Sequence, residues 1–349
     1  MSVPAKPVTI LDVAKRAGVS AGTVSRVLNR ANVPLDTRRR VSTAVSELGY
    51  VPNHAARSLK RRTTEQIALV IPDVGNPVYV QMAKSVQRVA AERGYRLSLI
   101  STENGVVDER QLLRGLHERQ LDGMVLVSLR PGPSLLRQIR EAAPRVCLIG
   151  SFPDDLPVDA VRVDSAHGVR QGVAHLLAGG RRRIAMVHGT RGTVPAETRA
   201  RGYRDALLEA GVPFRPELSV DGDFTMGSGY RAVDALEGAR PDAVFPDAVF
   251  CANDMMALGV MRRLRELGRD VPGDVAVVGM DDIDMAGMSA PTLTSVSLRA
   301  EERGRLATEM LLERLAHGGP LAPRVVHVLP ALVVRESSTA HVVLAGGPS

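Results

Sequence analysis

Polar side chains and two aromatic rings follow short apolar runs through the last five-sixths of the chain. These candidates for binding a ligand are Asn76, Tyr79, Arg199, Phe224, Asn253 and Asp281. Hydrogen-bonding groups beside an aromatic ring are typical of a site for a polar, neutral small molecule such as a sugar. Each residue alone has an ordinary alternative, because an Asp or Asn after a strand is commonly a helix cap and an Arg near a helix start commonly lies in a surface ion pair. Their shared position after strands favours a binding site.

Alternating strand and helix patterns are expected to position these side chains. Buried strands are expected at 67–71, 97–100, 124–127, 146–149, 161–163, 184–187, 249–251 and 275–278, and helices include 78–93, 108–119 and 133–143. Repeated βα units imply parallel sheets with helices on both faces. Roughly 270 residues of this pattern exceed one sheet, so two doubly wound lobes are expected. Ligands of such sheets bind outside the carboxyl ends of the strands, where the candidates lie.

A second group of candidates lies near the amino terminus, on a helix that Ser20 can cap. Its outward positions are small or hydrogen-bonding and include no acidic residue: Ala21, Gly22, Thr23, Ser25, Arg26 and Asn29. Such a face fits the major groove of DNA. The spacing alone leaves an ordinary helical hairpin as the alternative.

Three short helices are expected to position this face. Thr9 can cap the first helix, and Gly18 can end it in a left-handed conformation before Ser20 caps the second. A third helix, capped by Asp36 or Thr37 and ended by Gly49, is expected to close the core. The inward apolar positions follow helical spacing and are Ile10, Val13, Ala14, Ala17, Val24, Val27, Leu28, Val41, Ala44, Val45 and Leu48.

Positive charge is concentrated in the same part of the chain. Residues 1–62 contain 12 Lys and Arg but 3 Asp and Glu, a net charge of +9, whereas the remaining residues carry −2. A charge so local and asymmetric suits a polyanionic partner. The alternative, a basic solvated tail, would lack the periodic apolar faces.

A short cationic segment follows the three helices. Asn53 can cap a helix at 54–59, which is too short to be stable alone because isolated helices of fewer than ~12 residues are marginal in water. Leu59 stands among cationic residues, namely Arg57, Lys60, Arg61 and Arg62. An apolar side chain in such a segment suits partial insertion between base steps in a minor groove. A flexible linker whose Leu packs on the next domain is the alternative.

Several classes of protein are disfavoured by what the sequence lacks. It shows no export signal and no apolar run near ~20 residues, so we expect a cytoplasmic protein without a membrane segment. Cys147 and Cys251 stand in apolar contexts that favour buried free thiols. No Walker loop, HExxH, GxSxG or metal-spaced His/Cys set occurs, so we expect no enzyme, no metal and no cofactor.

The chain closely resembles the lactose-repressor/galactose-repressor family of bacterial transcription regulators. Four runs carry the resemblance: VTILDVAKRAGVSAGTVSRVLN, YVPNHAARSL, CANDMMALGVM and VAVVGMDD. It extends over about residues 8–337. The resemblance implies a dimer or tetramer whose helix-turn-helix heads bind a near-palindromic operator, with a hinge helix that orders on DNA. It also implies a periplasmic-binding-protein-like core that senses an effector.

The resemblance assigns roles by position. Base-reading positions would be held by Ala21, Gly22 and Arg26, with phosphate or supporting contacts from Ser20, Thr23, Ser25 and Asn29, and hinge positions by Asn53, Ala56 and Leu59. Effector positions would be Arg199, Phe224, Asn253 and Asp281, with Asn76 and Tyr79 in the matching first loop. Because Ala21 and Gly22 are small, operator choice is expected to rest on Arg26, on the hinge and on DNA deformability.

The expected ligand is a sugar or polyol. Residues 193–197 do not match the purine-sensing members, and Met280 stands where an aromatic residue often precedes the Asp. Purines and phosphorylated ligands stay open, as does the choice between inducer and corepressor.

The predicted architecture is an α/β chain with a small all-α head. We expect a helix-turn-helix domain at 8–52, a hinge at 53–62, a two-lobed core at 64–338 and a flexible tail at 339–349. The first lobe would comprise 64–163 and 296–322, and the second 164–292 and 323–338. The tail has no leucine heptads, so a homodimer is expected. The predicted function is a repressor under allosteric control, and a solute-binding transport protein is the alternative.

Overall fold

The computed structural model describes residues 8–28, 32–51, 63–103, 108–238, 245–317, 319 and 321–339. The chain divides into two compact units, Met1–Thr64 and Glu65–Ser349. The predictions for Asn29, for the hinge residues Asn53, Ala56 and Leu59, and for most of the tail lie outside the described residues.

Three helices form the described part of the first unit: α1 (Ile10–Ala17), α2 (Ala21–Leu28) and α3 (Leu35–Leu48). A capping box begins α1, since the Asp12 amide donates to Thr9 Oγ1 (3.4 Å) and the Thr9 amide donates to Asp12 Oδ2 (2.9 Å). Gly18 ends it with φ 66°. The core contains Val13, Ala14, Ala17, Val24, Val41 and Ala44, so the predicted apolar faces are confirmed.

The start of α3 differs from the prediction. The helix begins at Leu35 after Pro34, which offers no side-chain cap, and Asp36 already lies in the first turn. The prediction of Asp36 or Thr37 as the cap is therefore wrong. The fixed φ of proline, −50° here, presets the chain for helix entry, and Asp36 instead pairs with Arg40 one turn later at 3.3 Å.

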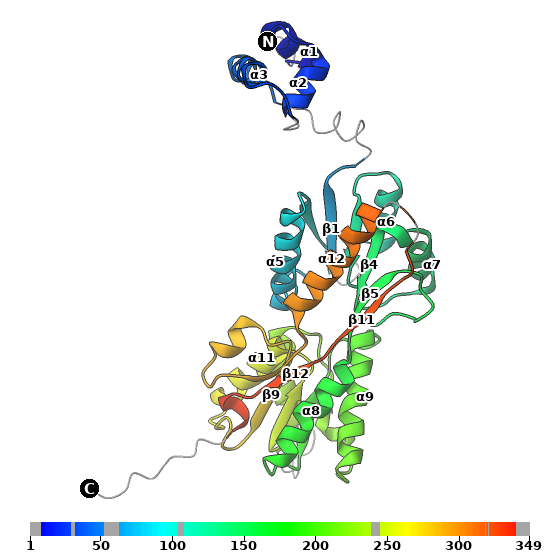
Figure 1. Ribbon diagram of the computed structural model, residues 1–349. Helices are drawn as coiled ribbons and strands as arrows, with labels where there is room; N and C mark the ends of the chain where they lie inside the picture. Colours follow the sequence, from blue (N-terminus) through cyan, green and yellow to red (C-terminus); the bar gives the residue numbers. More distant parts are fainter. Residues whose placement is uncertain are drawn as a thin grey trace, which may run out of the picture. The chain divides into compact units, whose positions relative to one another are not determined.

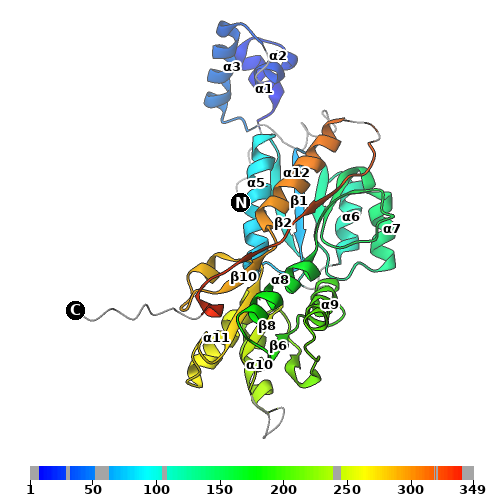
Figure 2. The same ribbon diagram turned by 60° about the horizontal axis from the view of Figure 1, so that its bottom comes forward.

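The first lobe of the second unit is a six-stranded parallel sheet of order β11-β5-β4-β3-β1-β2. Helices α5 and α12 lie side by side on one face, and α6 and α7 cover the other (Figures 1 and 2). The strands are β1 (Gln66–Ile71), β2 (Arg96–Ser101), β3 (Gly123–Leu126), β4 (Val146–Ile149), β5 (Asp159–Val163) and β11 (Val325–Val328). The helices are α5 (Pro77–Glu92), α6 (Glu109–His117), α7 (Pro133–Glu141) and α12 (Ala300–His317).

The second lobe is a six-stranded sheet of order β12-β10-β9-β8-β6-β7, in which only β12 is antiparallel to its neighbour. Helix α8 packs with α9, and α10 packs with α11 (Figure 2). The strands are β6 (Ile184–Val187), β7 (Ser219–Val220), β8 (Ala248–Cys251), β9 (Ala276–Met280), β10 (Thr294–Ser297) and β12 (Ala331–Val333). The helices are α8 (Ser165–Ala178), α9 (Val194–Glu209), α10 (Met226–Gly238) and α11 (Asp254–Glu266), and 3₁₀ turns occur at Ala143–Arg145, Pro216–Leu218, Asp284–Gly287 and Glu336–Ser338.

Strand pairing moves two predicted lobe boundaries. The sequence began the second segment of the first lobe at residue 296, but β10 continues to Ser297 in the second sheet. The sequence placed 323–338 in the second lobe, but β11 pairs with β5 in the first sheet. Arg324 holds the chain there, because its Nη2 lies 2.8 Å from the buried Asp159 carboxylate at the start of β5. The chain therefore returns to the second lobe only after Val328, where β12 pairs with β10.

Buried apolar strands form the core of both lobes. Cys147 and Cys251 are free and fully buried on β4 and β8, as predicted. Among the described residues, no helix is long and apolar enough to cross a membrane.

Two glycines allow α10 and α11 to approach closely. A Cβ added at Gly259 would lie 2.0 Å from the Met226 carbonyl oxygen, and one at Gly229 would lie 2.0 Å from the Met256 carbonyl oxygen. Such distances are far shorter than a van der Waals contact, so a side chain at either position would force one of the helices to move.

We expect Gly259→Ala to lower the free energy of unfolding by about 3 kcal/mol, at the upper end of overpacking costs, because backbone atoms have to move. Urea denaturation of the full chain measures this change. Gly238→Ala is the control, since no atom lies within 4 Å of its added Cβ. An unchanged midpoint for Gly259→Ala would contradict the close packing of the two helices.

Candidate functional site

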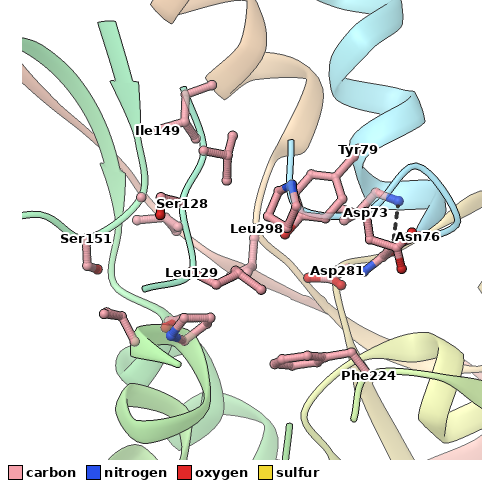
Figure 3. A pocket seen from close by; sticks show the side chains of 18 of the residues that line it. Asp73, Asn76, Tyr79, Ser128, Leu129, Ile149, Ser151, Phe224, Asp281 and Leu298 are labelled. Carbon is pink, nitrogen blue, oxygen red and sulfur yellow. Dashed lines mark hydrogen bonds between the residues drawn. The ribbon is translucent and has the colours of Figure 1, made fainter. Parts of the chain in front are cut away.

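A cavity lies where the carboxyl ends of strands from both lobes meet. Its walls come from the loops after β1, β3, β4 and β9, from α9, and from the start of α12. In Figure 3, Tyr79 and Asn76 lie near Asp281, Ser128 and Ile149 lie on the opposite side, and Phe224 approaches from the second lobe. Five of the six predicted ligand residues line this cavity: Asn76, Tyr79, Arg199, Phe224 and Asp281.

Asn253 does not line the cavity and is fully buried. Its Oδ1 accepts from the Met256 amide (2.9 Å), which caps α11, and its Nδ2 donates to the Phe224 carbonyl oxygen (2.9 Å). Both ends of the amide are therefore occupied. Through the first of these groups Asn253 caps α11, and through the second it positions Phe224.

Phe224 presents an aromatic face from a turn of unusual backbone geometry. Its φ is 69°, a conformation that L-residues adopt only when surrounding contacts impose it. A Cβ at Gly189 would lie 2.0 Å from the Phe224 ring, so only glycine fits beneath it. The guanidinium carbon of Arg199 lies 5.8 Å from the ring centroid, within cation-π range.

Arg199 and Asp281 form a buried ion pair. Arg199 Nη2 lies 3.7 Å from Asp281 Oδ1, and the two residues are 8% and 6% exposed. The Arg199 Nη1 donates to the Ala252 carbonyl oxygen, whereas its Nε has no partner in the described part of the chain. Burial raises the pKa of Asp281 to about 6, against the lowering effect of Arg199 and Arg303. The carboxylate is thus ionised at neutral pH and can accept hydroxyl protons.

A second buried carboxylate supports the turn that carries Asp281. Asp254 accepts from the Ser295 hydroxyl (2.6 Å) and from the Ile283 amide (2.9 Å), which joins α11 to the segments after β9 and within β10. Gly279 makes room for it, since a Cβ there would lie 2.2 Å from Asp254 Oδ1. Burial, with the nearby Asp281 next in effect, raises the pKa of Asp254 to about 7.

Sequence reasoning missed Arg303, which lines the cavity from the first turn of α12. Its position carried a signal, because Ala300 and Ala307 at helical spacing on either side are buried. A charged residue on an apolar helix face is a candidate for function. Tyr79 lies near it, and burial, with Asp281 next in effect, raises the pKa of the Tyr79 hydroxyl above its usual range.

The remaining walls mix hydroxyl and apolar groups. Further lining residues include Asp73, Ser128, Leu129, Ile149, Ser151, Ser165, Pro195, Asp223 and Leu298. Leu129 also joins the lobes, because its carbonyl oxygen accepts from the Val194 amide at 2.9 Å. On the other side of the lobe boundary, Gln81 Nε2 donates to Asp284 Oδ1 at 3.1 Å. A ligand between these contacts touches both lobes.

In the first unit, α2 presents a face without acidic residues. Ser20, Gly22 and Arg26 are exposed. Ser20 Oγ accepts from the Thr23 amide (3.2 Å), and Arg26 Nη2 donates to Thr23 Oγ1 (3.4 Å). The remaining two predicted positions on this helix, Ala21 and Ser25, are partly buried, and Ala21 packs against the helical core. Among the exposed residues of this face, Arg26 has the longest side chain.

Comparisons with known proteins match both units. The model for bacterial regulatory proteins of the lacI family matches residues 9–53, and the periplasmic binding protein-like domain matches residues 173–338. The HTH-type transcriptional regulator CelR of Thermobifida fusca is 39% identical over 341 residues, covering 94% of this chain and 98% of that protein.

Two solved structures are similar over nearly the whole chain. The CelR-cellobiose complex aligns with a TM-score of 0.70 and 36% identity, covering 95% of this chain and 99% of the other. The lac repressor dimer bound to operator and the anti-inducer ONPF aligns with a TM-score of 0.81 and 28% identity, covering 96% of this chain and all of the other.

The buried carboxylates give stability a definite pH dependence. The pKa of Asp254 is about 7 in the folded chain, above the value of about 3.9 in an unfolded one, so the folded state binds more protons between these pH values. Its contribution therefore lowers the free energy of unfolding as pH rises through this window, by up to about 1.4 kcal/mol per pH unit.

We expect Asp254→Asn to remove this contribution and to exceed the parent chain in stability at pH 8, since an amide can accept from Ile283 and donate to Ser295. Thermal unfolding from pH 4 to pH 8 measures the difference between the two slopes. Parallel slopes in the two proteins would contradict the raised pKa.

Proposed function

The chain belongs to the lacI family of bacterial regulatory proteins, so it is a DNA-binding regulator under ligand control, and we propose which residues carry these two activities. The helix α2 reads an operator, and the interlobe cavity binds a sugar or polyol. The observation that carries the proposal is that one chain combines an exposed, acid-free face on α2 with a polar cavity between two lobes.

Arg26 supplies the main direct readout of bases. It is exposed and its guanidinium matches the two acceptors of guanine in the major groove. Gly22 and the partly buried Ala21 allow close approach but offer no side-chain hydrogen bonds, while Ser20, Thr23 and Ser25 lie where phosphate contacts are made. On sequence alone, we also assign Asn29 to the DNA contacts and Asn53, Ala56 and Leu59 to the hinge.

The cavity suits a hydroxyl-rich ligand. Asp281 accepts hydroxyl protons, the Arg199 guanidinium donates, and the face of Phe224 covers apolar C–H groups of a sugar ring. The CelR relative was solved with cellobiose, which supports a sugar in the corresponding place. Asn76 caps α5 through the Val78 amide (3.2 Å) and borders the same space.

The ligand controls DNA binding through the lobes. Because the walls of the cavity come from both lobes, the ligand has a different affinity for each relative arrangement of them. The head at 8–52 and the hinge at 53–62 then respond to that arrangement in a homodimer on a near-palindromic operator. The lac repressor was solved as a dimer on its operator, which supports this assembly.

We expect Arg26→Ala to weaken operator binding by about 1–3 kcal/mol, the usual value of one bidentate base contact. The operator is first selected from random duplexes, and affinities are measured by fluorescence anisotropy at two salt concentrations. Binding to random DNA serves as the control and should fall much less, because it depends on the remaining cations. Equal losses on both duplexes would remove Arg26 from base readout.

We expect Arg199→Leu to leave operator affinity within about twofold and to abolish the response to ligand, since the guanidinium lies in the cavity and outside the head. Anisotropy titrations with and without ligand measure both quantities and also decide whether the ligand induces or corepresses. Arg201→Leu, which replaces an exposed arginine on the same helix α9, is the control. A normal response in Arg199→Leu would contradict the assignment.

A further inference from the structure

The Arg303 guanidinium has no anionic partner in the described part of the chain. The residue is 8% exposed, no carboxylate oxygen of a described residue lies within 4.0 Å of its nitrogens, and its Nε has no hydrogen-bond partner among those residues. Burial lowers the pKa of Arg303 to about 10, which leaves it protonated at neutral pH. The cavity wall thus holds a buried, unpaired cation.

Asp281 favours the charged form of Arg303, but none of its oxygens lies within 4.0 Å of the guanidinium nitrogens, so the two residues form no ion pair. The buried groups at this point are two guanidiniums, Arg199 and Arg303, and one carboxylate, Asp281, which pairs with Arg199. Two more carboxylates line the cavity, but Asp73 is only half-buried and accepts from the Gly75 amide, while Asp223 is exposed and accepts from Thr225. The buried part of the wall therefore carries an excess positive charge.

Neighbouring acidic residues do not face Arg303 either. Glu301 and Glu302 on the same helix are exposed. Asp254 does not line the cavity, and its two oxygens accept from Ser295 and Ile283.

Another arginine on the same helix provides a contrast. Arg314 is also buried on α12, but its Nη2 and Nε lie 2.5 Å and 3.2 Å from the Asp159 carboxylate oxygens. Its other donors reach the carbonyl oxygens of Leu321 (2.8 Å) and Ala322 (3.1 Å). Buried charges are normally paired in this way, because an unpaired charge is strongly unfavourable away from water. Arg303 lacks such pairing although it lies at the ligand cavity.

We propose that the ligand carries a compact oxyanion, a carboxylate or a phosphate group, and that the Arg303 guanidinium binds it. The inference rests on the proposed function, in which this cavity binds a sugar-like ligand, and it names the ligand class as a sugar acid or a sugar phosphate. The planar guanidinium fork matches either oxyanion, and Asp281 and Phe224 remain available for the hydroxyl groups and the ring.

The first test compares two substitutions in the ligand-free full chain. Arg303→Met removes an unpaired charge and is expected to raise the unfolding midpoint by about 2–4 °C or more, whereas Arg314→Met breaks a pair and lowers it. Arg303→Gln, which keeps polarity without charge, is measured beside it in case methionine packs poorly. A lower midpoint in both Arg303 variants would overturn the inference, because it would mean that the charge is compensated.

The second test measures binding by isothermal titration with matched probes: D-glucose, D-gluconate, D-glucuronate, D-glucose 6-phosphate, cellobiose and inorganic phosphate at constant ionic strength. We expect an acid or phosphorylated probe to bind at least about tenfold more tightly than its neutral counterpart, and Arg303→Met to remove that preference. The carboxylate and phosphate arms distinguish the two sources of the oxyanion. Equal binding of neutral and anionic probes, or no binding of any anionic probe, would overturn the inference.

Operator binding with the same probes separates this inference from the proposed function. If a neutral sugar changes operator affinity and no anionic probe acts more strongly in the parent chain than in Arg303→Met, the proposed function stands and the oxyanion is contradicted. An anionic probe that binds through Arg303 without changing operator affinity supports the oxyanion and contradicts ligand control at this site.

Discussion

The buried carboxylate of Asp254 holds the turn on which the ligand cavity depends. By accepting from Ser295 and from the Ile283 amide, it fixes the chain after β9, where Asp281 adopts a φ of 113° that few L-residues tolerate. Asp281 then faces Arg199, and the Arg199 guanidinium lies over the Phe224 ring. Asn253 in turn donates a hydrogen bond to the backbone carbonyl oxygen of Phe224. A carboxylate outside the cavity lining therefore positions the residues that border the cavity.

The cavity is lined by polar and charged side chains from both lobes because strands of the two sheets end at the same boundary. The first lobe contributes Tyr79 and Arg303, and the second contributes Arg199, Phe224 and Asp281. Direct hydrogen bonds between the lobes, such as Val194 to Leu129, lie beside the same space. Ligand binding is thus linked to how the lobes contact each other, which is the physical requirement for control of DNA binding from a distance.

The two units meet different physical demands. The head has a small core, and local signals set the ends of its helices. The Thr9 capping box begins α1, and the left-handed Gly18 and Gly49 end α1 and α3. Its excess of positive charge serves a polyanion and not its own stability. The second unit is nearly neutral in total, so its charges act locally, as the pairing of Arg314 and the unpaired Arg303 illustrate.

Local patterns in the sequence determined the elements and the class of protein. Helical spacing identified the three-helix core, β-branched runs identified most central strands, and the motifs at 8–29 and 50–59 pointed to the family. Position after a strand also identified five residues of the cavity wall, because parallel strands bring their carboxyl ends to one edge.

Tertiary structure decided the rest. Strands β7, β10, β11 and β12, which local patterns did not predict, are short and depend on their partners, and pairing alone placed β11 in the first lobe. Tertiary structure also placed Asn253 where it donates to the Phe224 carbonyl oxygen, and it brought Arg303 to the cavity. Local spacing could not predict either, because it does not encode burial and contact between distant segments.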